Sequence, residues 1–308
     1  MLLSYLMRSI VGEERAIAPK VKIGIVGDLH GAFDAEDARY FNRSDYDLLL
    51  LTGDLGSGTA QNGISIAREV ARLDKPTLVV AGNNDAPYAA EIGAEFKYQA
   101  RLAALMRVSR GRGEQESSVA LCGYDLRTYS FSDYSFSVLV GRPYSRGGPD
   151  LFHPEGLAER YGVFDHQGSE ALLREMVRAA PTRDILWLAH NGPSGLGERG
   201  TDIFGADFRK EEGDWGDRDL EAAVQFSKEE HRVLAVIAGH MHRRPPRQGA
   251  ERERTAQIEK DGTLYVNASV VPRIFSGAEG ELRHHMALEL YADGPPAIRD
   301  VWVEEAVR

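Results

Sequence analysis

Cysteine is almost missing from this chain, since Cys122 is the only one among 308 residues. A single cysteine cannot form an intramolecular disulfide or a thiolate cluster for zinc or iron–sulfur, so a disulfide-stapled scaffold is excluded. The cysteine content therefore predicts a reducing compartment, and we expect a cytoplasmic location. Cys122 lies in an apolar run and is expected to be buried rather than reactive.

Long hydrophobic runs are also missing. No stretch approaches the roughly 20 apolar residues that a membrane-spanning helix needs. Residues 1–7 are apolar, but no basic residues precede them and no small-residue cleavage site follows, so residues 1–20 are expected to form an arm rather than a signal peptide. No Ser/Gly/Pro-rich linker divides the chain, which predicts one domain over 1–308 with an elaborated loop insertion at 123–168.

Positive charge is in deficit, with 37 Lys and Arg against 47 Asp and Glu and a formal net charge of −10. This balance argues against broad adhesion to nucleic acid or to anionic membranes, which are themselves polyanions. We expect no membrane partner and no obligate protein partner. A bound metal with a local arginine patch would still let an acidic protein hold an anionic ligand.

Apolar runs recur along the chain, several of them rich in β-branched residues, and each predicts a buried strand. They lie at 21–26, 47–51, 77–81, 185–189, 234–238 and 264–267. Helical patterns at 63–73, 168–180 and 217–227 lie between several of them, which predicts an α/β fold. Two further strands, 286–291 and 298–303, flank the turn signal at 293–296 and predict an antiparallel hairpin closing a sheet.

Five of these runs end in residues that can hold a metal. The candidate ligands are Asp28, His30, Asp54, Asn83, His190, His240 and His242. The carboxyl ends of parallel strands line one crevice, so we expect these side chains to converge. A pair of divalent ions requires mixed nitrogen and oxygen ligands, ideally with one bridging carboxylate. With only two aspartates in the set, the loaded site stays net positive and favours an anion such as phosphate.

The motifs occur in a fixed order: Gly27-Asp-Leu-His-Gly31, Gly53-Asp54, Gly82-Asn-Asn-Asp85, His190 and Gly239-His-Met-His242. This ordered set resembles the calcineurin-like metallophosphoesterase superfamily. The resemblance implies a four-layer α/β/β/α sandwich of the metallophosphoesterase type with the metals at the strand ends.

The same resemblance implies a division of the ligands. Asp28, His30 and His242 would hold one metal, Asn83, His190 and His240 the other, and Asp54 would bridge them. A bridging hydroxide would attack phosphorus in line. The cofactors would be two divalent ions, with Mn²⁺ favoured and Fe, Co, Ni or Zn as alternatives.

Three further phrases resemble a less-studied branch of this superfamily found in cyanobacteria and plants. They are His190-Asn-Gly-Pro-Ser-Gly-Leu-Gly197, Gly213-Asp-Trp-Gly-Asp217 and Asn267-Ala-Ser-Val-Val-Pro-Arg273. The second is interpreted in two ways: as a turn capping the helix from Asp217, or as a substrate-side loop presenting Trp215.

Asn84 departs from the family pattern, because many members have a histidine after the metal-binding asparagine. An amide can donate a hydrogen bond to a phosphoryl oxygen but cannot act as a general acid. We therefore expect Asn84 to orient phosphate and, with Asp54, to belong to the catalytic set. The departure favours phosphodiesters or activated esters over alkyl monoesters.

Arginines are the remaining candidates for substrate binding. Arg243 and Arg244 follow His242 directly, and Arg142 lies in Gly141-Arg-Pro-Tyr144. A guanidinium near the metals would bind phosphate or a nucleotide tail. The alternative for most arginines of this region is an ordinary solvated loop.

The predicted function is hydrolysis of phosphodiesters, with nucleotides or nucleic-acid ends as candidate substrates. Two alternatives stay open. One is a phosphomonoester phosphatase, including a protein phosphatase; the other is a non-catalytic metal-binding scaffold of the same fold.

Overall fold

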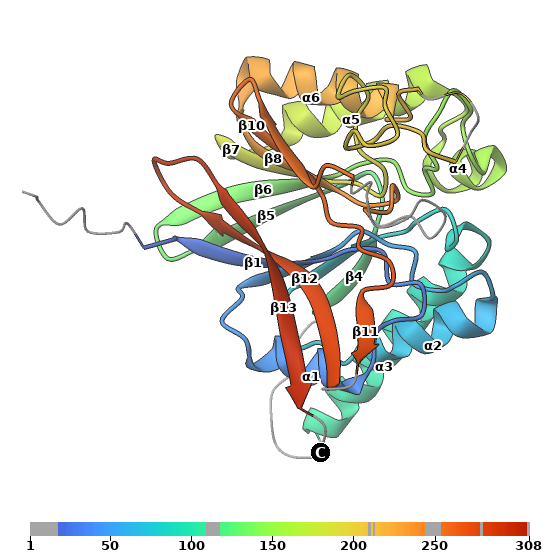
Figure 1. The fold of residues 1–308 in the computed structure, drawn as a ribbon, viewed down its shortest axis with the longest axis vertical. Helices are drawn as coiled ribbons and strands as arrows, with labels where there is room; N and C mark the ends of the chain where they lie inside the picture. The colour runs from blue at the N-terminus through green and yellow to red at the C-terminus, as the bar shows by residue number, and fades with distance from the viewer. Residues whose placement is uncertain are drawn as a thin grey trace, which may run out of the picture.

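The computed structural model describes residues 18–108, 118–208, 211, 213–243, 254–277 and 280–306. Its core consists of two mixed β-sheets, each covered on its outer side by helices (Figure 1). The predicted four-layer α/β/β/α sandwich is confirmed.

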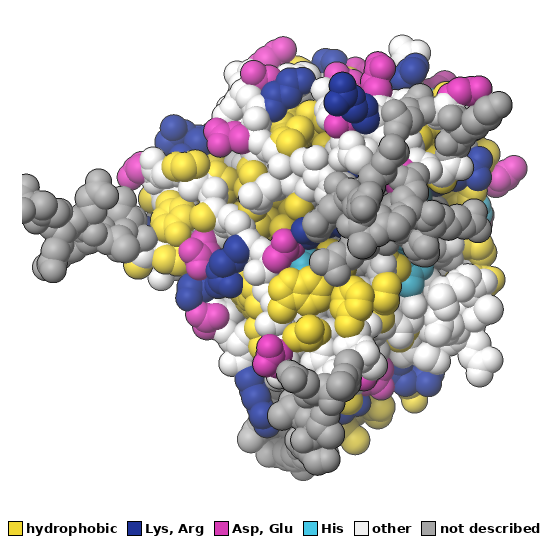
Figure 2. Space-filling model, in the orientation of Figure 1, with side chains coloured by type: hydrophobic (Ala, Val, Ile, Leu, Met, Phe, Trp, Pro, Cys, Tyr) yellow, Lys and Arg dark blue, Asp and Glu magenta, His cyan; other side chains and the backbone are white. Residues whose placement is uncertain are grey.

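The first sheet has seven strands in the order β11-β12-β1-β2-β3-β4, with β13 pairing β12. Its parallel part contains β1 (Val21–Val26), β2 (Leu48–Leu51), β3 (Thr77–Val80) and β4 (Val119–Cys122). Its antiparallel part contains β11 (Ile274–Gly277), β12 (Gly280–Leu290) and β13 (Ala297–Ala306). The predicted C-terminal hairpin is confirmed as β12–β13, and it extends the sheet beyond β1. Figure 2 shows hydrophobic side chains gathered over these three antiparallel strands on the face turned to the viewer.

The second sheet has six strands in the order β5-β6-β7-β8-β10-β9. They are β5 (Asp125–Phe131), β6 (Tyr134–Val140), β7 (Asp184–Leu188), β8 (Arg232–Ala238), β9 (Gln257–Lys260) and β10 (Thr263–Asn267). The middle strands β6, β7, β8 and β10 run parallel, so their carboxyl ends share one edge.

The helices divide between the two outer layers. The helices α1 (Ala35–Arg43), α2 (Ala60–Val70) and α3 (Ala89–Val108), with the short 3-10 helix η1 (Ala86–Tyr88), lie on the side of the first sheet. The helices α4 (Pro154–Tyr161), α5 (His166–Ala179) and α6 (Arg218–Glu230) lie on the other side. Among the helices described, none is long and apolar enough to cross a bilayer.

The leucines of strand β2 are buried in two different hydrophobic cores, one on each face of the sheet. Leu48 and Leu50 belong to the core between the sheets, whereas Leu49 and Leu51 belong to the core beneath the helices of the first sheet. Side chains alternate between the two faces of a strand, so an unbroken leucine run is buried on both.

The prediction of a loop insertion over 123–168 is wrong in its first third, because β5 and β6 form an antiparallel pair there. Serines alternate there with Tyr129, Phe131 and Phe136, which is the period of a half-buried strand, whereas the Gly, Ser and Arg content of the whole segment favours a loop. Helix α4 occupies part of the remainder. The predicted arm of residues 1–20 lies largely outside the described residues, although Lys20 continues β1 by donating its main-chain N–H to the carbonyl of Leu290 at 2.8 Å.

Candidate binuclear metal centre

Three of the predicted ligands meet beyond the ends of β1 and β8. Asp28, His30 and His242 form a first ligand group, in which one potential ligand atom from each residue lies within 4.8 Å of the others. The Nε2 atoms of His30 and His242 are 3.1 Å apart, and His242 Nε2 is 3.7 Å from Asp28 Oδ2. Two ring nitrogens and one carboxylate thus converge, as a divalent transition metal requires.

Asp54, His190 and His240 form a second ligand group under the same 4.8 Å criterion. Asn83 joins it, because its Oδ1 is 3.0 Å from His190 Nε2. His190 Nδ1 is 2.6 Å from the carbonyl oxygen of Thr52 and must donate its proton there, since a carbonyl only accepts. In the neutral ring, the Nε2 lone pair then faces the amide oxygen of Asn83. Two acceptors pointing at each other fit a cation held between them.

Asp54 belongs to the second ligand group and also reaches the first. Its Oδ2 is 3.5 Å from His30 Nε2 of the first group, and its Oδ1 is 3.6 Å from His190 Nε2 of the second. The residue is 2% exposed. One carboxylate oxygen therefore faces each group, which is the arrangement a bridging ligand needs.

The backbone at these positions is unusual. His30, Asp54 and His240 have positive φ angles of 42°, 48° and 65°. Non-glycine residues seldom adopt this left-handed conformation, and it is concentrated at functional sites. A Cβ on Gly82 would lie 2.1 Å from Asp54 Oδ1, so this glycine gives the carboxylate its room.

Hydrogen bonds orient the buried ligand Asp28. Its Oδ1 accepts from Thr52 Oγ1 at 2.8 Å, and its Oδ2 accepts from Ser269 Oγ at 2.9 Å and from the main-chain N–H of His240 at 2.8 Å. Such partners fix the direction of a carboxylate and its affinity for metal.

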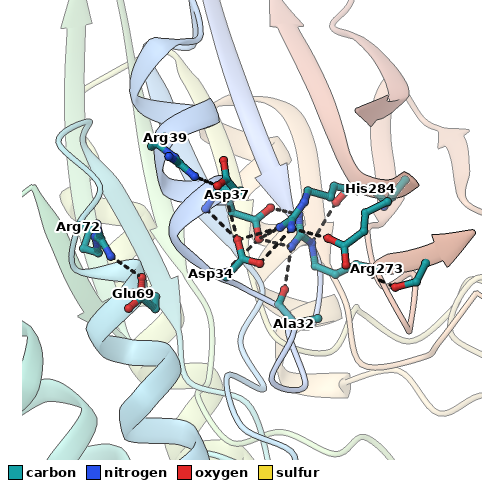
Figure 3. A network of polar contacts seen from close by, with 12 residues as sticks. Ala32, Asp34, Asp37, Arg39, Glu69, Arg72, Arg273 and His284 are labelled. Atoms are coloured by element: carbon teal, nitrogen blue, oxygen red, sulfur yellow. Dashed lines mark hydrogen bonds and ion pairs between the residues drawn. The ribbon is translucent and has the colours of Figure 1, made fainter. Parts of the chain in front are cut away.

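The loop that carries His30 is held from the C-terminal part of the chain. Arg273 Nη1 donates to the carbonyl of Ala32 at 2.7 Å, and the guanidinium pairs with Asp37 at 2.9 and 3.0 Å (Figure 3). Arg273 is 2% exposed. This network explains why an arginine closes the Asn267–Arg273 phrase.

The electrostatics prepare the site for cations. Burial lowers the pKa of His240 to about 3 and also lowers the pKa of His242, so both rings are neutral at pH 7. Burial raises the pKa of Asp28, but the positive charge that His190 can carry outweighs burial and lowers it. Burial lowers the pKa of His190, but Asp54 and Asp28 outweigh burial and raise it. Neutral imidazoles and ionised carboxylates bind metal, so a cation in this site would displace the proton that the aspartates hold on His190.

Residues 21–244 match the family model for calcineurin-like phosphoesterases. The chain belongs to the calcineurin-like phosphoesterase family. Together with the two ligand groups, membership supports a metal-dependent phosphoesterase, a hydrolase of phosphate esters.

Solved structures with a similar arrangement share little sequence with this phosphoesterase. A hypothetical protein from Thermus thermophilus has 15% identity and a TM-score of 0.44, covering 92% of this chain and 99% of its own. Haemophilus influenzae NAD nucleotidase has 8% identity and a TM-score of 0.48, covering 93% of this chain and 50% of its own. Chaetomium thermophilum Vps29 has 9% identity and a TM-score of 0.29, covering 92% and 97%. No curated protein sequence matches the chain.

Asn84 lies against Asp54 in this phosphoesterase. Its side-chain Nδ2 donates to Asp54 Oδ2 at 2.8 Å, and its main-chain N–H donates to Asp54 Oδ1 at 2.9 Å. Asn84 thus positions the carboxylate that faces both ligand groups.

Two of the arginines predicted to bind substrate are buried in ion pairs. Arg142 contacts Asp217 at 2.9 Å and Asp219 at 2.8 Å, and Arg243 contacts Asp300 at 2.6 and 2.9 Å. Arg142 is 3% and Arg243 5% exposed. Both guanidinium groups are therefore engaged with carboxylates of the chain itself. Arg244 lies outside the described residues.

The residues that position the ligands were not predicted from the sequence. Thr52 and Ser269 hold Asp28, and Arg146 binds His240 through its main-chain carbonyl at 3.0 Å. Ser269 could have been predicted, because it follows the predicted strand that ends at Asn267 and therefore lies at the sheet edge where the metal ligands converge. A main-chain carbonyl carries no signal in the sequence.

Proposed function

We propose that this protein is a binuclear phosphodiesterase that hydrolyses phosphodiesters, including nucleotides or nucleic-acid ends, with Mn²⁺ as the favoured metal. The observation that carries the proposal is the position of Asp54, with one oxygen toward His30 at 3.5 Å and the other toward His190 at 3.6 Å. A single carboxylate shared by two ligand groups supports two metal ions close together rather than two independent sites.

The proposed ligands follow from these contacts. Asp28, His30 and His242 would hold one ion, Asn83, His190 and His240 the other, and Asp54 would bridge. Two bound divalent cations supply charge for the phosphoryl oxygens and activate a water nucleophile at neutral pH. The chain itself orients the ligands and excludes bulk water by burying Asp28, Asp54 and His190. Main-chain carbonyls hold a proton on His190 Nδ1 and on His240 Nε2.

The preference for diesters rests on Asn84. Its amide donates to Asp54 and has no proton to transfer to a poor leaving group, so substrates that need strong general acid help are disfavoured. Arg142 and Arg243 remain candidates for substrate binding only if their ion pairs rearrange. A cytoplasmic location remains a prediction from the cysteine content.

A metal-by-substrate screen tests the proposal. Bis-aryl and mono-aryl phosphates, cyclic nucleotides and single-stranded oligonucleotides are each assayed with Mn, Mg, Zn, Ni and Co, with Asp54→Ala as the control. We expect the highest kcat/KM for diesters with Mn²⁺ and a loss of at least about 10³-fold in Asp54→Ala. Higher activity on monoesters would favour the phosphatase alternative. Metal binding without any turnover would favour the scaffold.

A further inference from the structure

One backbone carbonyl near the second ligand group accepts two side-chain hydrogen bonds. The carbonyl oxygen of Arg146 is 3.0 Å from His240 Nε2 and 2.8 Å from the indole Nε1 of Trp215. A carbonyl oxygen has two lone pairs, so it accepts both bonds at once. The shared acceptor therefore connects a metal ligand directly to a tryptophan from the unexplained Gly213–Asp217 phrase.

This contact decides which nitrogen of His240 is available to a metal. A carbonyl cannot donate, so the ring proton lies on Nε2 and the lone pair lies on Nδ1. If the carbonyl moved away, the proton would be free to occupy either nitrogen. The position of the Arg146 carbonyl thus selects the tautomer that ligates.

Trp215 is itself fixed on both sides. Its carbonyl accepts from Asn191 Nδ2 at 2.9 Å and from the main-chain N–H of Gly148 at 3.2 Å, while its main-chain N–H donates to the carbonyl of Phe204 at 3.1 Å. Gly148 has a φ of +77°, and a Cβ there would lie 2.5 Å from the indole ring. The indole and the 146–148 loop therefore fit together only with glycine at that position.

The same loop is anchored a second time by Asp217. This carboxylate accepts from Arg142 at 2.9 Å and from Ser145 Oγ at 2.6 Å. Asp217 is 3% exposed and Ser145 is fully buried. The Gly213–Asp217 phrase thus holds the loop on both sides of Arg146: Asp217 binds Ser145 before it, and Trp215 binds Gly148 after it. These contacts explain both the tryptophan and the last aspartate of the phrase.

We propose that Trp215 is a positioning residue of the metal centre: its indole N–H holds the Arg146 carbonyl against His240 Nε2 and thereby presents Nδ1 to the cation of the second ligand group. The inference deepens the proposed function and rests on it for the presence of that cation. Of the two interpretations of the Gly213–Asp217 phrase, the position of Trp215 beside the metal centre agrees with the substrate-side loop rather than with a simple helix cap. Trp215 acts through another residue and does not itself need to touch the substrate.

Metal titration of single ligand groups tests the proposal. In a His30→Ala background the first group is disabled, and calorimetry with Mn²⁺ reports the second. Adding Trp215→Phe, which keeps a ring but removes the N–H, is expected to weaken this binding by about 10–100-fold. In a His190→Ala background, which disables the second group, Trp215→Phe is expected to leave Mn²⁺ affinity unchanged.

Two control variants distinguish loss of the hydrogen bond from Trp215 to the Arg146 carbonyl from a general loss of structure. Trp302→Phe makes the same substitution on β13 and is expected to leave the affinity of the second group unchanged. Arg146→Ala removes an exposed side chain but keeps the carbonyl, so it should also leave that affinity unchanged. Equal weakening of both ligand groups by Trp215→Phe would overturn the proposal.

A metal-free measurement gives an independent readout. Nitrogen-15 NMR of histidine-labelled protein reports the tautomer of His240, whose signal is assigned with His240→Gln. The wild type should show the Nε2–H form, and Trp215→Phe should show a mixture; an unchanged tautomer would overturn the proposal. Neither measurement uses a substrate, so a wild type that binds two metals without hydrolysing esters would refute the proposed function alone.

Discussion

Arg243 and Asp300 form a two-point ion pair, with nitrogen–oxygen distances of 2.6 and 2.9 Å. Arg243 directly follows the ligand His242, while Asp300 lies on β13, beyond the residues 21–244 that match the family model. His284 of β12 also contacts Asp300, through Nε2 at 2.7 Å. The C-terminal hairpin therefore supports one side of the metal centre.

Replacing Asp300 with asparagine should destabilise the protein by about 2 kcal/mol at pH 7, because the mostly buried Arg243 would lose its two-point ion pair with this carboxylate. Burial raises the pKa of Asp300, but hydrogen bonds from Arg243 and His284 outweigh it and hold the pKa below the usual range. A carboxylate with a lowered pKa stabilises the fold above its unfolded pKa of about 4, and this stabilisation is lost as the pH falls. Urea unfolding should show a larger gap between wild type and Asp300→Asn at pH 7 than at pH 3. A gap that widened on acidification would contradict the ion-pair explanation.

Removing metal should lower thermal stability. Ions that bind only the folded chain stabilise it by about 2.7 kcal/mol at 100 times Kd, and the two ligand groups exist only in the folded chain. Calorimetric scans with EDTA and with Mn²⁺ should differ in Tm by about 5 °C or more. The Asp54→Ala variant serves as the matched control and should show a much smaller difference. Equal shifts in both proteins would indicate metal binding elsewhere.

The convergence of the metal-capable side chains was predictable, whereas their supports were not. Asp28, Asp54 and His240 follow buried apolar strands, and parallel strands deliver such residues to one edge whatever the loops do. The carbonyl of Arg146 depends on the path of a loop after β6, which no side-chain pattern encodes. β6 alternates serines with apolar residues and so carries a strand pattern, but it lies in a segment whose Gly, Ser and Arg content favours a loop. Helix α3 was also not predicted, because its apolar residues do not form a stripe on one side of the helix. Leu105 and Met106, for example, are 68% and 55% exposed.

Asn84→His should move the substrate preference toward monoesters. Histidine would supply the proton donor that an amide lacks, although it would also replace the 2.8 Å bond from Asn84 Nδ2 to Asp54. We expect the monoester-to-diester ratio of kcat to rise by about 10-fold or more for alkyl leaving groups. Kinetics on matched methyl and aryl esters measure this ratio, with Asn84→Ala controlling for the lost amide. If Asn84→His and Asn84→Ala gave the same ratio, the general acid explanation would fail.

Ser269→Ala should weaken the first ligand group selectively. The mutation removes the 2.9 Å hydrogen bond to Asp28 Oδ2 and leaves those from Thr52 and the His240 N–H in place. Loss of one such support typically costs 10–100-fold in metal affinity. We expect about 10-fold weaker Mn²⁺ binding in the His190→Ala background and no weakening in the His30→Ala background. Ser276→Ala, on the exposed surface of β11, should leave both affinities unchanged.

Gly239→Ala should disrupt the centre by displacing a ligand rather than by straining the backbone. A Cβ at this position would lie 2.1 Å from Asp28 Oδ1 and 2.5 Å from Thr52 Oγ1, distances that force the carboxylate out of its hydrogen bonds. Gly239 has no positive φ, so the added methyl group acts by contact alone. The expected result is loss of Mn²⁺ binding by the first ligand group and a fall in kcat/KM of about 10²-fold or more. Gly213→Ala provides the matched control, because a Cβ there meets nothing within 4 Å. A Gly239→Ala protein with two intact Mn²⁺ sites would mean that Asp28 is not required where the geometry places it.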